Sequence, residues 1–465
     1  MTTPSAPSTA ASTAPSTAPS SGSAKRPVPP LATPRPPKLP VVAERTLDSG
    51  LRVLALRRRG VPLAELRLRI PFAGPTGRGG RAHTAQAQLL GDTLLSGTER
   101  RTAAELAAEV QAVGGQLNAT VDADRLGFGG SVLVSGLPGL LDVLGDVLTG
   151  ATFPKHEVVG ERDRLVQELA MYRSQASVVA REALLSRMYG DHPYGRELPA
   201  ADEIAQVKAS QLRSLHGRIA PAGSLLTIVG DLPPSKALDL VEAALSGWTA
   251  TSTALTTPEL PPAPTGPALL VDRPGAVQTT LRMAASAPSR TDPDYAAFVL
   301  ANLVFGGYFS SRWVANIRED KGYTYSPHAQ VEHPPAGSRI TLSADVSTPT
   351  TAAALLETVY ELGRVATTPV SQAELDQARR YAIGVLALGT SSQAGLASTV
   401  SQLAGAGLGV EWLRDHPRQL QAVTVEDALA AGARYLAPNR LTTVMVGDVA
   451  QVEAPLRTLV DLEVA

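Results

Sequence analysis

Short runs of alternating apolar and polar residues predict β-strands in two separate parts of the chain. The clearest runs are 52–57, 64–70, 117–121 and 126–134 in the first part, and 268–272, 279–283, 338–346 and 441–446 in the second. Longer helical stretches separate them, and two begin with capping boxes, Thr102-Ala-Ala-Glu105 and Ser371-Gln-Ala-Glu374. Strand pairs joined by tight turns, together with these helices, predict an α+β fold with helices packed on an antiparallel-rich sheet.

The two parts of the chain are similar to each other. Each ends with an apolar strand followed by the same turn, Leu226-Thr-Ile-Val-Gly-Asp231 and Thr443-Val-Met-Val-Gly-Asp448, and the two aspartates lie 217 residues apart. Each begins with a pair of strands around a short turn, and aligning Gly60 with Gly275 gives an offset of 215. Two anchors with nearly equal offsets indicate duplicated domains.

Composition marks the expected domain boundaries. Residues 1–40 are rich in Ala, Ser, Thr and Pro and lack the apolar residues that a core needs, so a disordered tail is predicted there. Residues 256–267 contain several prolines and no apolar periodicity, which predicts a linker. The expected domains are therefore 41–255 and 268–465.

Overall composition excludes several classes of function. The 465 residues carry a net charge of −1 and 4% aromatic residues, which argues against nucleic acid as a partner. The absence of cysteine excludes disulfides, thiolate metal sites and a cysteine nucleophile. No apolar run reaches the about 20 residues of a membrane span, and no apolar segment typical of a signal peptide is found, so a cytoplasmic location is expected.

The usual catalytic motifs are also missing. The sequence contains no phosphate-binding loop, no nucleophile elbow and no dinucleotide-binding glycine motif. None of its seven histidines is followed by another four residues later, the spacing that places two imidazoles on one helix face.

Several blocks of residues, in order along both halves, carry a resemblance to a known family. They are Gly97-Thr98, Asn118-Ala-Thr, Phe153-Pro, His192-Pro-Tyr-Gly-Arg196, Gly306-Gly-Tyr-Phe-Ser-Ser-Arg312 and Ile317-Arg-Glu-Asp-Lys-Gly-Tyr-Thr-Tyr-Ser326. With them, residues 41–465 resemble the M16 (pitrilysin/insulinase-like) metallopeptidases, in the branch that includes the mitochondrial processing peptidase. This resemblance implies two homologous M16-type domains.

The family binds zinc through an inverted His-x-x-Glu-His helix and a glutamate about 75 residues later, and the motif glutamate activates water. Counting back from Gly97-Thr98 places this motif on Gln88-Leu-Leu-Gly-Asp92. The resemblance thus implies that Gln88 and Asp92 replace the two histidine ligands, that Gly91 replaces the base, and that Glu168 retains the distal ligand position. A register beginning at His83 also lacks the second histidine and the glutamate. We expect no metal or other cofactor in this chain.

The second half matches the family at different positions. The family's substrate-contacting Arg and Tyr fall on Arg318 and Tyr325, and both are retained. A guanidinium and a phenol donate hydrogen bonds to a peptide carbonyl and to the oxyanion formed from it. Gly306-Gly307 is expected to form a tight turn ahead of a helix.

The sequence-based hypothesis is a non-catalytic subunit of a heteromeric M16 peptidase. Its partner would be a catalytic M16 subunit with an intact His-x-x-Glu-His motif and bound zinc. This chain would form part of the chamber wall, bind an extended peptide by strand addition, and supply Arg318 and Tyr325 in trans. Three alternatives stay open: a purely structural subunit, a peptide-binding or chaperone-like protein without a role in proteolysis, and a site for a metal other than zinc.

Overall fold

A computed structural model describes residues 39–249, 255–262, 264 and 266–465. The predicted tail, except for Leu39 and Pro40, lies outside these residues, as do positions 263 and 265 of the predicted linker. The domain boundaries inferred from composition therefore stay predictions.

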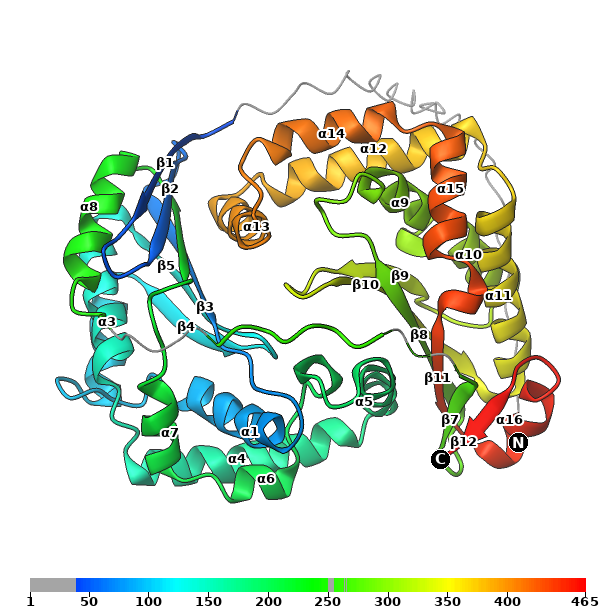
Figure 1. Ribbon diagram of the computed structural model, residues 1–465, viewed down its shortest axis with the longest axis horizontal. Helices are drawn as coiled ribbons and strands as arrows, with labels where there is room; N and C mark the ends of the chain where they lie inside the picture. Colours follow the sequence, from blue (N-terminus) through cyan, green and yellow to red (C-terminus); the bar gives the residue numbers. More distant parts are fainter. Residues whose placement is uncertain (1–38, 250–254, 263, 265) are drawn as a thin grey trace, which may run out of the picture. The chain divides into compact units, whose positions relative to one another are not determined.

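The first half forms a mixed six-stranded sheet in the order β1-β2-β6-β3-β5-β4, and only β2 and β6 pair in parallel (Figure 1). Its strands are β1 Val41–Thr46, β2 Arg52–Arg57, β3 Leu63–Pro71, β4 Gln116–Val121, β5 Arg125–Leu133 and β6 Leu225–Gly230. Its helices are α1 Arg78–Thr93, α2 Ala103–Ala112, α3 Leu137–Gly150, α4 Lys155–Arg173, α5 Ala176–Tyr189, α6 Ala201–Ala205, α7 Ala209–His216 and α8 Pro234–Leu245, with short 3-10 turns η1 Val134–Gly136 and η2 Pro193–Gly195.

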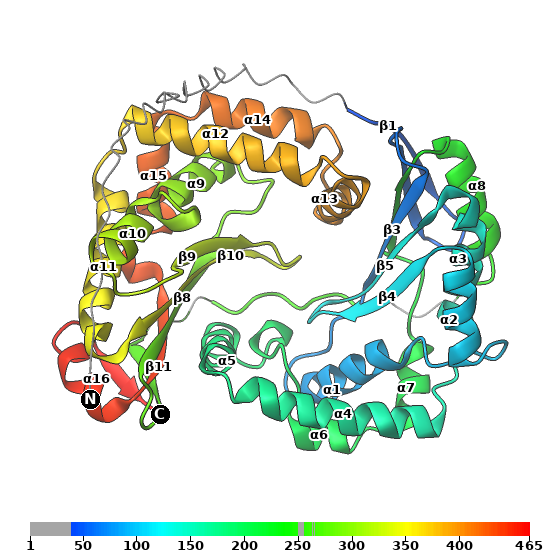
Figure 2. The ribbon, with the colours of Figure 1, turned by 180° about the vertical axis from the view of Figure 1, so that it is seen from behind.

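The second half repeats this plan as the sheet β12-β7-β11-β8-β10-β9 (Figure 2). Its strands are β7 Ala268–Asp272, β8 Gln278–Ala287, β9 His328–Glu332, β10 Ser338–Ser347, β11 Thr442–Gly447 and β12 Leu462–Val464. Its helices are α9 Tyr295–Asn302, α10 Arg312–Val314, α11 Thr351–Thr367, α12 Gln372–Gly389, α13 Gln393–Gly405, α14 Trp412–Ala422, α15 Val425–Tyr435 and α16 Val449–Leu456. Two π-helical segments, η3 Leu303–Gly307 and η4 Ala315–Asp320, and the 3-10 turns η5 Thr348–Thr350 and η6 Pro438–Arg440 complete it.

The repeated turns predicted from the sequence are built alike in both halves. The backbone N–H of Gly60 donates to Asp231 (3.3 Å), and that of Gly275 donates to Asp448 (3.1 Å). Both glycines have positive φ, 133° and 74°, a conformation that favours glycine. The predicted α+β class and the two similar domains are thus confirmed by the fold.

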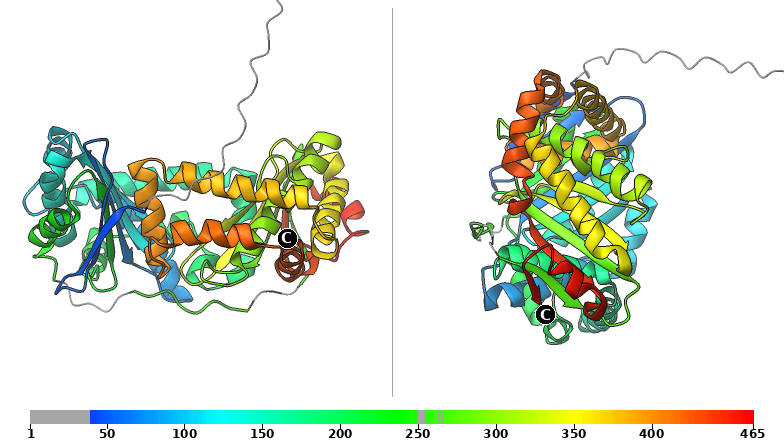
Figure 3. Two further views of the ribbon diagram at one scale, coloured as in Figure 1. Left: turned by 90° about the horizontal axis from the view of Figure 1, so that it is seen from above. Right: turned by 90° about the vertical axis from the view of Figure 1, so that its right-hand side faces the viewer.

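Each sheet covers its own core with one face. In the first half, Leu66, Leu68 and Phe128 are buried beneath helices of that half, including α3 and α8. In the second, Leu342 and Phe298 belong to a core that α11 helps to cover, and Figure 3 shows α11 lying across this sheet. Burial of these large side chains provides the main driving force for each domain.

The opposite faces of the two sheets receive one helix each from the other half. Helix α13 packs on β2 and β6, in a cluster formed by Leu54, Leu56, Leu225, Val229, Leu396, Ala397, Val400 and Leu403. Helix α5 packs on β8 and β11, in a cluster that includes Leu184, Leu185, Met188, Ala284 and Val444. The sequence pattern of each half predicts helices packed on one face of its own sheet, so these two exchanged contacts are a feature of the tertiary structure.

A buried histidine on α14 predicts acid sensitivity. His416 is 5% exposed and stacks on Trp412, with ring centroids 4.2 Å apart. Burial, with the nearby Arg290 charge, lowers the pKa of His416 to about 4. An unfolded histidine has a pKa of about 6.5, so between these values the unfolded chain binds the extra proton, and stability falls as pH falls, by at most about 1.4 kcal/mol per pH unit.

We expect His416→Phe, which keeps an aromatic ring, to reduce the loss of unfolding free energy between pH 7 and pH 5. His333 retains its own contribution, because its pKa is also lowered to about 4 by burial. Urea unfolding at the two pH values measures the effect. The control is His156→Gln, since that imidazole is 81% exposed. An unchanged difference between pH 7 and pH 5 in His416→Phe would contradict the assignment.

Candidate functional site

The positions matched to the zinc motif lie on α1, which packs against α4. Gln88 and Asp92 are one helical turn apart, and the Gln88 amide donates to the Asp92 carboxylate (Nε2–Oδ2 3.3 Å). Loss of water around its carboxylate raises the pKa of Asp92, and the negative charges of Glu161 and Glu168 on α4 add to this effect. The structure thus brings Gln88, Asp92 and Glu168 into one neighbourhood, as the sequence match predicts.

A positive side chain, Arg164, lies among these carboxylates. Its Nη1 is 2.5 Å from Glu168 Oε1, and its Nε is 2.9 Å from Glu161 Oε1. Arg164 precedes Glu168 by four residues and follows Glu161 by three, the spacings that place helical side chains on one face. Sequence matching overlooked Arg164, although this spacing was visible. The guanidinium neutralises the carboxylate that the family uses as the distal ligand.

Gly91, which the sequence match aligns with the family's catalytic base, has little space around it. A Cβ built on Gly91 would lie 2.7 Å from Val121 Cγ2, at the end of the edge strand β4. Any side chain at this position therefore requires Val121 or α1 to move. The close approach of α1 to β4 explains why glycine fits here, independently of any catalytic role.

The residues present do not fit zinc. The position offers one neutral amide and two carboxylates, one of which is already ion-paired with Arg164, whereas zinc in proteins prefers imidazole and thiolate. Within the part of the chain that the structure describes, no group of three or more His, Cys, Asp or Glu side chains has an arrangement suited to a metal ion. The side chain that would activate water is replaced by Gly91.

The alternative register of the zinc motif begins at His83, whose side chain is buried. His83 is 8% exposed, and its Nε2 lies 2.8 Å from the carbonyl oxygen of Phe72, so it ties α1 to the end of β3. Burial lowers the pKa of His83, which favours the neutral ring. His83 therefore has a structural role in this fold.

Arg318 and Tyr325, which were predicted to contact substrate, lie side by side. The guanidinium carbon of Arg318 is 5.1 Å from the centre of the Tyr325 ring and 4.3 Å from that of Phe309. Tyr325 is 82% exposed and Phe309 is 61% exposed, so this cation–π group faces outward. Arg318 lies in η4, a π-helical segment of the kind often found at functional sites.

The glycines before this block do not form the tight turn predicted for them. Gly306 and Gly307 end η3, and neither has positive φ. A Cβ on Gly306 would lie 2.9 Å from the Trp313 ring, which itself stacks on Phe305. Glycine is needed here for close packing of the buried Trp313, a contact that spacing along the sequence does not reveal.

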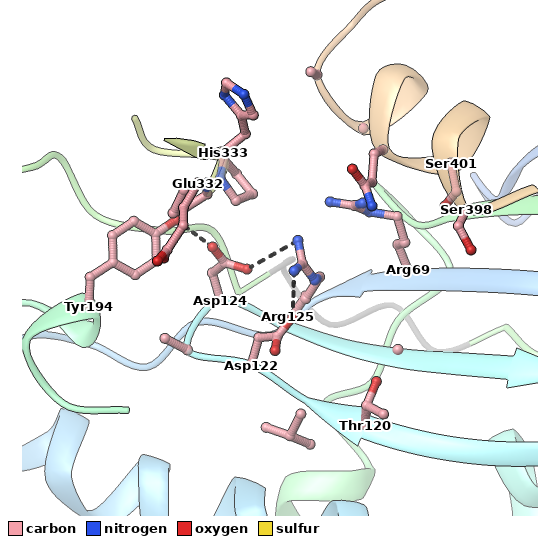
Figure 4. Close-up of a pocket in the computed structure, with 18 of the residues that line it drawn as sticks. Arg69, Thr120, Asp122, Asp124, Arg125, Tyr194, Glu332, His333, Ser398 and Ser401 are labelled. Carbon is pink, nitrogen blue, oxygen red and sulfur yellow. Dashed lines mark hydrogen bonds and ion pairs between the residues drawn. The ribbon is translucent and has the colours of Figure 1, made fainter. Parts of the chain in front are cut away.

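A cavity of about 1130 Å³ opens between the exposed part of the first sheet and the second half. Gln88 lines it, together with residues of β3, β4 and β5 from the first half and of β9, β10 and α13 from the second. Figure 4 shows Arg69 on β3, Thr120 on β4, and Ser398 and Ser401 on α13 around this space. Neither Arg318 nor Tyr325 lines it.

The floor of the cavity is the polar face of the first sheet. Cross-strand register aligns Arg67, Gly129 and Asn118 in one row, and Arg69, Gly127 and Thr120 in the next. Nothing lies within 4 Å of a Cβ built on Gly129, so the floor is open there. Strand β4 forms the edge of the sheet and has no strand partner on its outer side among the described residues. Such an edge accepts an added strand.

Charged side chains at the wall of the cavity connect the two halves. Arg181 on α5 pairs with Glu197 (2.6 Å) of its own half and with Glu332 (3.1 Å) on β9. Arg339 on β10 is 4% exposed and lies 2.5 Å from Glu332. These arginines lower the pKa of Glu332 to about 2 despite its partial burial. The network holds the wall of the cavity in one arrangement.

Comparison with protein families gives two matches. Residues 84–202 match the model described as "Insulinase (Peptidase family M16)", and residues 207–381 match that described as "Peptidase M16 inactive domain". The second match begins before β6, so its limits differ from the boundary between the two sheets. No helix within the described residues has the length and apolar character needed to cross a bilayer.

Relatives and solved structures agree with these matches. The chain is 27% identical over 430 residues to an uncharacterized zinc protease of Mycobacterium tuberculosis (strain H37Rv), covering 90% of this chain and 96% of the relative. It is 29% identical over 129 residues to a probable mitochondrial-processing peptidase subunit beta of Arabidopsis thaliana, covering 28% of this chain and 24% of the relative.

The fold is shared with a crystal structure described as a peptidase M16 inactive domain from Pseudomonas fluorescens (TM-score 0.81, 22% identity, 88% of this chain and 98% of that one). A protease from Helicobacter pylori is similar as well (TM-score 0.78, 17% identity, 88% of this chain and 100% of that one). With both family models matched in order and the fold shared over most of its length, this chain belongs to the M16 peptidase family.

Proposed function

We propose that this chain is a non-catalytic subunit of a heteromeric M16 peptidase, and that a partner chain carries the zinc and the general base. The observation that carries the proposal is the contrast between two sites. Arg164 is ion-paired with Glu168 beside Gln88 and Asp92, where the family holds its metal, while Arg318 and Tyr325 are retained and face outward.

The roles of this chain's own residues follow from their positions. The open edge of β4 offers backbone N–H and C=O groups to an extended peptide that enters the cavity. Arg318 and Tyr325 lie outside this chain's cavity, which suits contact with a peptide held in the partner's site. There the guanidinium and phenol would donate hydrogen bonds to the peptide carbonyl, and more strongly to the oxyanion that forms from it.

The proposal predicts no peptidase activity in the isolated chain. Purified alone with added Zn²⁺, it is expected to leave an unstructured fluorogenic peptide intact, because Gly91 supplies no base and Arg164 competes with the metal for Glu168. Mixing with an M16 chain that has an intact His-x-x-Glu-His motif is expected to give chelator-sensitive cleavage above that of the partner alone. Chelator-sensitive turnover by the isolated chain would refute the proposal.

A second candidate is a peptide-binding protein without a role in proteolysis. The cavity favours it, because a volume of about 1130 Å³ can take up a peptide without contact to Arg318 or Tyr325. The same mixing experiment separates the two candidates: binding of peptides by the isolated chain, without any gain in the partner's turnover, supports the second.

A further inference from the structure

The cavity contains more positive than negative side chains. Six arginines line it, Arg67, Arg69, Arg125, Arg181, Arg290 and Arg339, against four acidic residues, Asp122, Asp124, Glu197 and Glu332. Lysine is absent from the lining. Because buried or half-buried charges are usually paired, the partners of these arginines show where an uncompensated charge remains.

Four of the arginines have acidic partners. Arg67 pairs with Glu65 (3.1 Å), and Arg125 pairs with Asp122 (2.5 Å). Arg181 and Arg339 share Glu197 and Glu332 in the network that joins the two halves. The remaining acidic residue, Asp124, accepts a hydrogen bond from the Tyr194 hydroxyl and lies 4.0 Å from Arg125, so each acidic residue of the lining has a partner.

The other two arginines, Arg69 and Arg290, form no ion pair of 4.0 Å or less with the described residues, and the Asp122 and Asp124 carboxylates act on Arg69 only from a greater distance. Arg290 donates to the neutral amide of Gln402 (3.4 Å), and its Nε is buried without a hydrogen-bond partner among those residues. Arg69 lies against the end of α13, where a Cβ on Gly405 would approach its guanidinium carbon to 3.0 Å. Burial and the repulsion of Arg125 and Arg290 outweigh the attraction of Asp124 and Asp122 and lower the pKa of Arg69 to about 10, which still leaves it charged at neutral pH.

The path from Arg69 to the open edge of the sheet is free of large side chains. Arg69 is followed across the sheet by Gly127 on β5 and by Thr120 on β4. Figure 4 shows Arg69 reaching from β3 toward α13, with Thr120 on the neighbouring floor. A group on a peptide beside β4 would therefore meet no bulky residue in the row that leads to Arg69.

We propose that Arg69 and Arg290 bind a carboxylate of a peptide in this cavity, so that the chain prefers peptides that present a carboxylate there. Guanidinium groups bind carboxylates with charge-assisted, often bidentate hydrogen bonds, and partial removal from water strengthens them. The carboxylate comes either from an Asp or Glu side chain or from the C-terminus of the peptide. This inference rests on the proposed function only in requiring that the chain binds a peptide.

Fluorescence anisotropy with the full chain and three labelled ten-residue Gly/Ser/Ala peptides tests the proposal. One peptide has a central Glu and an amidated C-terminus, the second a central Gln and a free C-terminus, and the third a central Gln and an amidated C-terminus. We expect at least one carboxylate-bearing peptide to bind about tenfold or more tightly than the third, and this preference to weaken with added salt. The peptide that binds more tightly identifies the source of the carboxylate.

Variants assign the preference to the arginine pair. Arg69→Gln with Arg290→Gln is expected to abolish it, and Arg69→Lys to retain part of it, because lysine keeps the charge and loses the bidentate geometry. Arg418→Gln is the matched control, since Arg418 is 64% exposed and does not line the cavity. Thermal unfolding checks that each variant is folded.

Failure of the assignment to the arginine pair and failure of peptide binding itself give different results in this experiment. Equal binding of all three peptides, or a preference that persists in the double variant, would overturn the assignment to Arg69 and Arg290 while leaving peptide binding intact. If none of the three peptides binds, both this inference and the peptide-binding part of the proposed function are wrong.

Discussion

In the complex with a zinc-bearing partner, Arg318→Ala is expected to lower kcat by about 10²–10³-fold, with a smaller change in KM. Removal of a single preorganised donor to an oxyanion has an effect of about this size. A contact that tightens as the carbonyl becomes an oxyanion affects kcat more than substrate binding. Steady-state kinetics of the assembled pair, with this chain in excess, measure both constants.

Tyr325→Phe separates the phenol from the ring. The variant keeps the aromatic face that lies 5.1 Å from the Arg318 guanidinium and removes only the hydroxyl. A lower kcat in this variant would assign a hydrogen bond to the phenol, whereas an unchanged kcat would limit Tyr325 to positioning Arg318.

Arg434→Ala is the control for Arg318→Ala. Arg434 also lies over a tyrosine ring, Tyr435, at 5.2 Å, and its side chain is 63% exposed. The Arg434→Ala variant should leave kcat unchanged. If Arg318→Ala and Arg434→Ala give the same rate as the unmodified complex, the contact in trans is excluded.

The second large effect is expected at the network that joins the two halves. Arg339→Leu should lower the free energy of unfolding by roughly 3 kcal/mol, because breaking a buried ion pair leaves a charge without its partner in a medium that solvates it poorly. After the loss of Arg339, Glu332 would keep the Arg181 charge at 3.1 Å and the neutral hydrogen bonds from Thr341 and Gln330. Urea unfolding at pH 7 measures the change.

Two further variants test this explanation. Replacing Glu332 as well, in Arg339→Leu/Glu332→Leu, should recover much of the loss, since no unpaired carboxylate remains. Arg282→Leu, on the neighbouring strand β8, should lower the free energy of unfolding by less than Arg339→Leu does. Its partner Asp345 is 49% exposed and is readily hydrated. A double variant as unstable as Arg339→Leu alone would show that the loss comes from packing.

Peptide access also depends on this network. Arg181, Glu197, Glu332 and Arg339 all line the cavity in which we place the peptide. Because these four side chains pair with one another, Arg69 and Arg290 are the arginines of the lining that have no ion-pair partner among the described residues. The same arrangement of charges therefore contributes to stability and restricts the chemistry of the cavity.

Local features of the fold were predictable from the sequence because their causes lie within a few residues. The run 52–57 forms β2 with the predicted limits, and the capping box of Thr102 and Glu105 begins α2. The repeated Val-Gly-Asp turns identified the duplication, and their aspartates accept hydrogen bonds from the two glycines that the alignment had paired. These features depend on backbone conformation and short-range hydrogen bonds.

The candidate site was predictable only in part. Matching along the sequence located Gln88, Gly91, Asp92 and Glu168, and it located Arg318 and Tyr325. It did not identify Arg164 as the group that neutralises Glu168, nor Arg69 and Arg290 as arginines without an ion-pair partner among the described residues. A charge is recognised as paired or unpaired only when the elements around it have been brought together, and for Arg69 those elements are β5 and α13, distant in sequence.

By itself, the sequence determined the α+β class, the duplication, the family, and the loss of histidines at the metal helix, because each of these is a matter of residue identity or local periodicity. Only the tertiary structure decided that α5 and α13 are exchanged between the two sheets, that Gly306 makes room for Trp313, and that two arginines face the cavity without acidic partners. The physical reason is that burial and charge compensation are set by side chains from separate segments, whose proximity depends on how the whole chain packs.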